Sequence, residues 1–497
     1  MSSSRSLLVG SKNRAVQVMK YALMSRVLVW VITLVANFFV SPYDTSSSVA
    51  IFGDKQPTAV DKAVWALFGQ YTRWDAAYFL RIAEVGYEYE KNHAFGPMLP
   101  IVANLVRKCL CMSYFDGDGG LWSVKTSLLV SGLLHMHIHF VGAAWALYQL
   151  SKVVLKNEKQ AFVSSILFCF NPASIFMSAY YSETFFAFCS FVGMLCYERG
   201  VELKENSDKN NSRTSILTDS LCVGEGIEAL GAFLFFSACA FRANGLVLVG
   251  FPVYHFAKGH VWPGFSKRFL KLQEGRFSSA GPANGPTAGF MLLATAKYLV
   301  LSIIGILPYF GMQLYARTLY CNGDSTDRAW CKSSNIYAHV QEAYWDLGPF
   351  AYYRVSKIPN FVLALPVVTL SLWTFRRYIG RLRHRHGCAS QFPAIDRVTA
   401  VVGLNNQSES LDLPIVGFHS HRVAPYVWYM FVLTVFGLVM MHVEVLTRFL
   451  FASSPPLYWF AATLINKRDP RSHYILGYFA IYFVMGSILF STFYPWT

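Results

Sequence analysis

The chain has 497 residues, of which 54% are hydrophobic and only 14% are charged, whereas roughly 25% of the residues in soluble domains are charged. This composition excludes an ordinary soluble globular protein and indicates an integral membrane protein. The formal net charge of +15 does not indicate a nucleic-acid partner, because the basic residues concentrate in short segments, as they do in the cytosolic loops of membrane proteins. These segments are residues 152–159, 258–276 and 376–386.

Six apolar segments are long enough to cross a bilayer, since about 20 apolar residues span a hydrocarbon core of roughly 30 Å. In chain order they are residues 21–40, 126–150, 298–315, 358–374, 423–441 and 474–495.

Two longer apolar blocks predict hairpins, and a third predicts a broken helix or a re-entrant turn. Residues 161–197 are too long for one pass and contain the helix-breaking pair Asn171-Pro172. Residues 230–254 are interrupted by a polar turn, and residues 449–465 contain two adjacent prolines. Together, these patterns predict an all-α polytopic protein in which residues 1–497 form a single domain with nine to eleven transmembrane helices.

The positions of the basic loops predict which connections face the cytosol. Residues 41–125 and 316–357 then lie on the opposite, lumenal side, and the polar stretches 202–220 and 387–420 are expected as cytosolic inserts. The sequons at Asn210 or Asn211 and at Asn406 are therefore not expected to be glycosylated. Cys321 and Cys331 share a lumenal loop, where a disulfide is one of two open alternatives.

The first lumenal loop carries the richest polar pattern, over residues 73–87. Read as a helix, it places Asp75 at the start of an apolar stripe formed with Phe79 and Ile82, with Glu84 on the opposite face. An amphipathic helix of this kind on the membrane surface would hold a carboxylate near lipid headgroups. The alternative is that Asp75 caps the helix and Trp74 anchors it at the interface.

Charged and aromatic residues within the apolar blocks form a second set of candidates. Glu183 stands alone in a long apolar block, where ionisable groups are costly and usually functional, although it could instead close the hairpin turn. Arg242 and Arg448 could bind phosphate or merely flank their helices, and Trp345 could stack on a sugar or belong to an interfacial belt. His135, His137 and His139 alternate along a helix and favour structural roles, so no metal site is expected.

Several segments, taken in order, resemble the GPI mannosyltransferase 2 family. The resemblance covers nearly the whole chain, and several matched segments in order are more specific than any one of them. The matched segments are residues 73–87 with 89–97, Asn171-Pro172-Ala173-Ser174-Ile175-Phe176 with Tyr181-Ser182-Glu183, Arg242-Ala243-Asn244-Gly245, Tyr344-Trp345-Asp346-Leu347-Gly348, and 447–460.

The resemblance implies a multi-spanning glycosyltransferase of the GT-C type in the endoplasmic reticulum membrane, with a lumenal active site and no cofactor. It implies dolichyl phosphate mannose as the donor and a mannosyl-glucosaminyl-phosphatidylinositol intermediate of the GPI anchor as the acceptor, joined through an α-1,6 bond. A β-linked donor and an α product imply inversion, with Asp75 as the general base. Residues expected to contact substrate are Arg73, Trp74, Glu84, Tyr87, Asn171, Glu183, Arg242, Asn244, Trp345 and Arg448.

Three alternatives remain open from the sequence. A dolichyl-phosphate-sugar-dependent transferase could act on another acceptor. A lipid or solute transporter would usually show internal helical repeats, which this chain lacks, and a non-catalytic subunit would lack the acid of the first loop. The resemblance also leaves open a small accessory membrane subunit as a partner.

Overall fold

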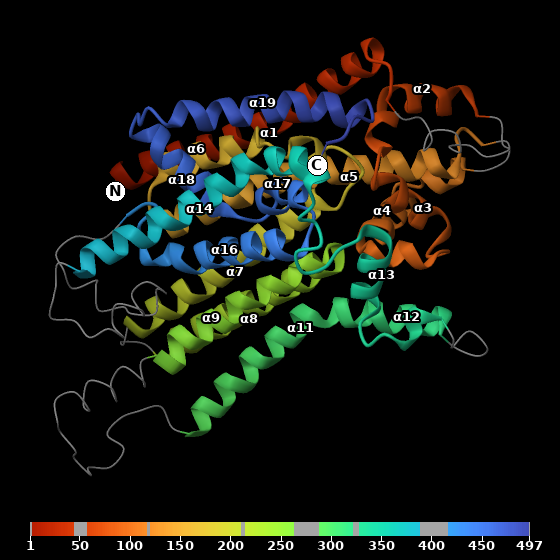
Figure 1. The fold of residues 1–497 in the computed structure, drawn as a ribbon. Helices are drawn as coiled ribbons and strands as arrows, with labels where there is room; N and C mark the ends of the chain where they lie inside the picture. Colours follow the sequence, from red (N-terminus) through yellow and green to blue (C-terminus); the bar gives the residue numbers. More distant parts are fainter. Residues whose placement is uncertain are drawn as a thin grey trace.

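The structure is a computed structural model that describes residues 2–43, 57–116, 120–209, 214–262, 288–321, 328–387 and 416–496. Figure 1 shows long helices running side by side as a bundle, with the short helices α2, α3, α4, α12 and α13 gathered toward one end. The long helices are α1 (Ser2–Phe39), α5 (Val124–Leu155), α7 (Glu183–Lys209), α8 (Thr214–Phe241), α11 (Ala288–Tyr320), α14 (Ile358–Gly387), α16 (Ala424–Met440) and α19 (Ser472–Ser491).

Shorter helices and helical turns connect the long ones. The shorter α-helices are α2 (Ala59–Phe68), α3 (Ala76–Val85), α4 (Met98–Cys109), α6 (Glu158–Cys169), α9 (Gly250–Phe256), α12 (Ala329–Lys332), α13 (Ile336–Trp345), α17 (Leu446–Phe451) and α18 (Pro455–Asn466). The turns are η1 (Gly69–Thr72), η2 (Glu90–Ala94), η3 (Met112–Phe115), η4 (Ser174–Met177), η5 (Ala243–Val249), η6 (Ala257–Val261), η8 (Val355–Lys357), η10 (His421–Val423) and η11 (Val443–Val445).

Seven helices of the described ranges are long and apolar enough to cross a membrane, so the chain is a multi-pass membrane protein. They are formed by α1, α5, α8, α11, α14 with η8, α16 with η10, and α19. The sequence predicted nine to eleven passes. The difference lies in helices such as α6 and α18, which have 12 residues each.

The predicted interruptions of the apolar blocks are confirmed. The first block divides into α6 and α7, separated by the non-helical Asn171-Pro172 segment and η4. The second breaks at Arg242, after which the chain continues through η5, and the third divides into α17 and α18 with Pro455 opening the new helix. The first two breaks meet in the bundle, because Glu183 pairs with Arg242.

The polar stretch at residues 202–220 is not simply a loop, as the sequence predicted. Helix α7 extends to Lys209 and α8 begins at Thr214. An ion-pair cluster holds the two helices together here, with Lys204 Nζ 2.8 Å from Glu225 Oε1 and 2.7 Å from Glu228 Oε1. Most of the stretch expected at 387–420, and the sequons at Asn210, Asn211 and Asn406, lie outside the described residues.

Helix α3 confirms the helix expected in the first lumenal loop and shows where its apolar face goes. Phe79 and Ile82 are 4% and 5% exposed, because α3 packs against α4 and α5. The apolar stripe therefore contacts protein, whereas the sequence suggested a membrane surface. Burial of this face fixes α3 rigidly beside the bundle.

A buried arginine ties the N-terminal helix to the break between α6 and α7. Arg26 of α1 is 3% exposed and donates to the Ser174 backbone carbonyl (2.7 Å) and the Ser178 hydroxyl (2.8 Å). It also donates to the Cys169 carbonyl (3.3 Å), and its guanidinium lies 3.8 Å from the centre of the Phe140 ring. Neutral acceptors therefore hold this cation.

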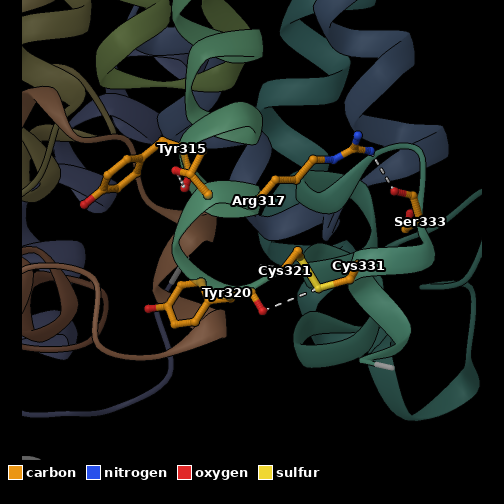
Figure 2. Close-up of a disulfide and its surroundings, with 7 residues drawn as sticks. Tyr315, Arg317, Tyr320, Cys321, Cys331 and Ser333 are labelled. Carbon is orange, nitrogen blue, oxygen red and sulfur yellow. Dashed lines mark hydrogen bonds between the residues drawn. A yellow bond between two sulfur atoms is a disulfide. The ribbon is translucent and has the colours of Figure 1, made fainter. Parts of the chain in front are cut away.

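Cys321 and Cys331 form a disulfide just beyond the end of α11 (Figure 2). This settles the alternative that the sequence left open. Arg317 of α11 donates to the Ser333 carbonyl (3.0 Å), and this bond also holds the loop against the helix (Figure 2). Because disulfides persist in oxidising compartments, the pair supports the predicted lumenal side for this end of α11.

Candidate active site

Asp75 lies at the start of α3 but does not cap it. Trp74 adopts a left-handed conformation (φ 57°), which is uncommon for a bulky residue and turns the chain sharply before the helix. The Asp75 backbone N–H donates to the Tyr181 hydroxyl (3.0 Å), and its side chain makes no capping hydrogen bond. The capping alternative is therefore wrong for this side chain, which points away from the helix backbone.

Arg448 of α17 holds the Asp75 carboxylate. Both of its terminal nitrogens, Nη1 and Nη2, donate to Asp75 Oδ2 at 3.1 Å. Among the described residues, none donates to Asp75 Oδ1, and the Asp75 side chain is 30% exposed. One carboxylate oxygen is thus fixed by a cation while the other stays available to a substrate.

Glu183 connects this pair to the second arginine. Its carboxylate is fully buried, and Oε1 lies 3.5 Å from Arg448 Nη1 and in ion-pair contact with Arg242 Nη1. The break after α6, the break after α8 and the turn before α17 therefore bring two carboxylates and two guanidinium groups together. The predicted phosphate-binding arginines are both engaged with carboxylates in this structure.

Two neighbouring carboxylates stabilise the charged form of Arg448. Burial disfavours the charged form, but the carboxylates of Asp75 and Glu183 outweigh it and raise the pKa of Arg448 above its ordinary value. The guanidinium also lies 5.2 Å and 5.5 Å from the ring centres of Phe176 and Tyr181. It is therefore a permanent cation in a largely aromatic wall.

A cavity of about 840 Å³ opens beside this cluster, within the size range of small-molecule binding sites. It is bounded by α3, η5, α11, α13, η11 and α17. Six of the residues predicted from the sequence line it: Trp74, Asp75, Arg242, Asn244, Trp345 and Arg448.

Comparison with known proteins now identifies the family. Residues 15–497 match the family model described as Mannosyltransferase (PIG-V). The chain belongs to the PIG-V mannosyltransferase family. It is 31% identical to the GPI alpha-1,6-mannosyltransferase 2 of Homo sapiens over 88% of this chain and 90% of the human protein.

Other members of the PIG-V family match over almost their whole length. Identity is 30% to the Rattus norvegicus GPI alpha-1,6-mannosyltransferase 2, over 97% of this chain and 98% of that protein. It is 28% to the Drosophila melanogaster GPI mannosyltransferase 2, over 97% and 99%. A solved Archaeoglobus fulgidus oligosaccharyltransferase gives a TM-score of 0.41 at 10% identity, over 95% of this chain and 53% of that chain, which is too low to carry a conclusion about the site.

Five of the predicted substrate contacts lie outside the lining of the cavity in this mannosyltransferase. Arg73 places its guanidinium 4.2 Å from the centre of the Phe493 ring. Glu84 pairs with Arg81 (3.1 Å) and Lys125 (3.6 Å). The other three are Tyr87, which donates to the Phe95 carbonyl, Asn171, which accepts from the Ala173 N–H, and Glu183, which reaches the cavity through the two arginines.

Two residues that line the cavity were not predicted as site residues from the sequence. Tyr181 lies in a segment that resembles the family, but nothing in the sequence indicated that its hydroxyl accepts a hydrogen bond from the Asp75 N–H. Glu444 lines the cavity just before α17. It stands between two apolar segments, and the argument applied to Glu183 would have found it.

Proposed function

We propose that this mannosyltransferase transfers mannose from dolichyl phosphate mannose, through an α-1,6 bond, to a mannosyl-glucosaminyl-phosphatidylinositol intermediate of the GPI anchor. The near-full-length match to relatives named GPI alpha-1,6-mannosyltransferase 2 supports the acceptor class and the linkage. The reaction takes place on the lumenal face of the endoplasmic reticulum membrane. The Cys321–Cys331 disulfide supports the lumenal side, because disulfides persist in oxidising compartments. Helix α13 follows this disulfide in the chain and lines the cavity.

The observation that carries the chemical proposal is the half-free carboxylate of Asp75. Arg448 fixes Oδ2, so that Oδ1 has no donor among the described residues, on a side chain that lines the cavity. As general base, Asp75 takes the proton from the 6-hydroxyl of the acceptor mannose. The resulting oxygen attacks the anomeric carbon of the donor from the face opposite to the phosphate, which inverts the β linkage to α.

Movement of charge during this step gives the arginines their role. The bond between the anomeric carbon and the phosphate oxygen breaks, its electron pair stays on the phosphate, and the phosphodiester becomes a monoester with an additional negative charge. At the same time Asp75 becomes neutral by accepting the proton. Arg448 then faces a carboxylic acid in place of the Asp75 carboxylate, so its stabilisation, together with that of Arg242, shifts toward the more negative phosphate of the leaving group.

The test is complementation of cells that lack the second GPI mannosyltransferase, with surface GPI-anchored protein as the measurement. The wild-type chain is expected to restore the signal, and Asp75→Asn at matched expression is expected to reduce it at least 100-fold, because an amide cannot take the proton. Asp469→Asn is the matched control, since Asp469 pairs with Arg471 outside the cavity lining.

Each outcome bears on a different part of the proposal. Rescue by both wild type and Asp75→Asn would remove Asp75 as the base and direct attention to Glu183. Failure of the wild type would count against the acceptor, or would indicate that an accessory membrane subunit must be supplied with the chain. Co-expression of the accessory subunit from the organism that supplies this chain distinguishes a wrong acceptor from a missing subunit.

A further inference from the structure

Glu444 is a second carboxylate on the cavity wall, separate from the cluster around Asp75. It lies in η11, four residues before Arg448, so the two side chains start about one helical turn apart on the same strip of wall. The Tyr352 hydroxyl donates to Glu444 Oε1 (2.7 Å), and the Asn360 side-chain amide donates to the same oxygen (3.3 Å). The carboxylate is thus held in one orientation by Tyr352, which precedes η8, and by Asn360 of α14.

The other oxygen of this carboxylate has no partner. Glu444 Oε2 is buried and accepts no hydrogen bond from the residues that the structure describes. The nearest basic group among those residues is His442, whose Nδ1 lies 3.9 Å from Oε1, and no lysine or arginine of the described chain pairs with Glu444. A buried carboxylate without a lysine or arginine partner is costly, and the Glu444 side chain is 17% exposed where it lines the cavity, so a ligand there can reach it.

Tyr352 cannot supply the missing charge. Burial, followed by the Glu444 carboxylate, raises the pKa of Tyr352 well above its ordinary value, so the hydroxyl remains a neutral donor. Lys357 lies 5.1 Å from the centre of the Tyr352 ring, on that ring and not on the carboxylate. The ligand that best complements Glu444 is therefore a cation that also donates hydrogen bonds.

The charged residues that line the cavity differ in sign. Arg448 and Arg242 suit the donor phosphate, whereas Glu444, which pairs with no lysine or arginine of the described chain, would repel a phosphate. The acceptor contains glucosamine, whose primary amine is largely protonated near neutral pH. We propose that Glu444 binds this ammonium group and thereby selects acceptors that carry a free amine, an assignment that rests on the proposed function.

The position of Glu444 agrees with the order of sugars in the acceptor. Asp75 acts on the terminal mannose, and the glucosamine is the next sugar. Glu444 lies in the 3-10 turn η11 and Arg448 in α17, so their backbone positions are roughly 6–7 Å apart along the chain, which is comparable with the spacing of adjacent sugars. Trp345 lines the same part of the cavity, and its backbone carbonyl bonds His442 Nε2 (2.7 Å), which fixes this wall.

The experiment compares two acceptors with the purified full-length enzyme and dolichyl phosphate mannose: mannosyl-glucosaminyl-phosphatidylinositol and its N-acetylated analogue, which has no charge on nitrogen. The wild type is expected to favour the amine acceptor at least tenfold in kcat/KM. Glu444→Gln keeps an oxygen for Tyr352 and Asn360 but loses the charge. It is expected to raise KM for the amine acceptor about tenfold, to bring the acceptor ratio close to one, and to leave KM for the donor unchanged.

Tyr352→Phe is the matched control, because it removes the orienting hydroxyl and keeps the charge, and it is expected to retain the acceptor preference. If Glu444→Gln lowers activity on both acceptors equally, the residue is structural and the assignment is overturned. If the wild type, supplied with the accessory membrane subunit where cells require one, uses neither acceptor, the proposed function itself is wrong. Should Glu444→Gln not accumulate, Glu444→Asp is expected to weaken the amine acceptor several-fold more than the analogue, and equal weakening overturns the assignment.

Discussion

Arg26 and Arg448 are two buried cations in the same bundle, and they meet opposite kinds of partner. Arg26 donates to backbone carbonyls and hydroxyls of the break between α6 and α7 and pairs with no carboxylate among the described residues. Arg448 contacts two carboxylates and borders the cavity. Neutral acceptors at fixed positions make a structural clamp. Arg448 instead pairs with carboxylates beside a cavity, so its electrostatic partners can change during a reaction.

The largest expected effect is at Arg448. Arg448→Met is expected to lower the initial rate of mannose transfer by about 10²–10³-fold, because it removes a charged donor aimed at developing charge and releases Asp75 from its orientation. The rate is measured with purified enzyme at saturating donor. Arg471→Met is the control, since Arg471 pairs with Asp469 and does not line the cavity. A rate within twofold of wild type would show that Arg448 is a clamp like Arg26.

At Arg26 we expect a loss of stability with little loss of activity, the reverse of the effect expected at Arg448. Arg26→Met leaves at least two backbone carbonyls without a donor and is expected to cost about 3 kcal/mol of stability, at roughly 1–3 kcal/mol for each unpaired buried group. The thermal midpoint in detergent and the amount of folded protein should fall further than for Arg448→Met. Specific activity per folded molecule should stay within about twofold. A selective loss of activity without loss of stability would contradict the structural role.

A smaller effect is expected at Tyr181. Tyr181→Phe removes the hydroxyl that accepts from the Asp75 N–H while keeping the ring beside Arg448, and an unpaired donor costs about 1 kcal/mol or more. We expect kcat to fall about fivefold to tenfold with little change in KM. Tyr180→Phe is the matched control, because the Tyr180 hydroxyl is buried and has no partner among the described residues. Equal effects of the two variants would show that the Asp75–Tyr181 bond does not position the base.

Much of the fold could be predicted because the membrane imposes long uncharged segments and makes every interruption conspicuous. The breaks near Asn171, at Arg242 and before Pro455 were all visible as polar or proline residues in apolar surroundings. The polar stretch at 202–220 misled because its helical continuation is supported by an ion pair with Lys204. Hydropathy does not report such pairing.

The sequence indicated which residues belong to the candidate site better than it indicated how they contact one another. Asp75, Glu183, Arg242 and Arg448 were each singled out, but Asp75 and Arg448 lie 373 positions apart, and no local pattern reports a contact at that distance. Their pairing therefore needed the structure. Whether Arg73, Glu84, Tyr87 and Asn171 contact substrate stays a prediction.

The disulfide between Cys321 and Cys331 gives this protein a chemical marker of its own orientation. Because disulfides persist in oxidising compartments, the predicted topology, with Cys321 and Cys331 on the lumenal side, is compatible with this bond, whereas a chain inserted the wrong way round would keep both thiols reduced. Reactivity of these two cysteines toward a thiol probe, read residue by residue, therefore reports how a population of molecules was inserted in the membrane where it was made. For the same reason, chains produced in a reducing compartment are expected to lack the Cys321–Cys331 disulfide near α13 and the cavity wall.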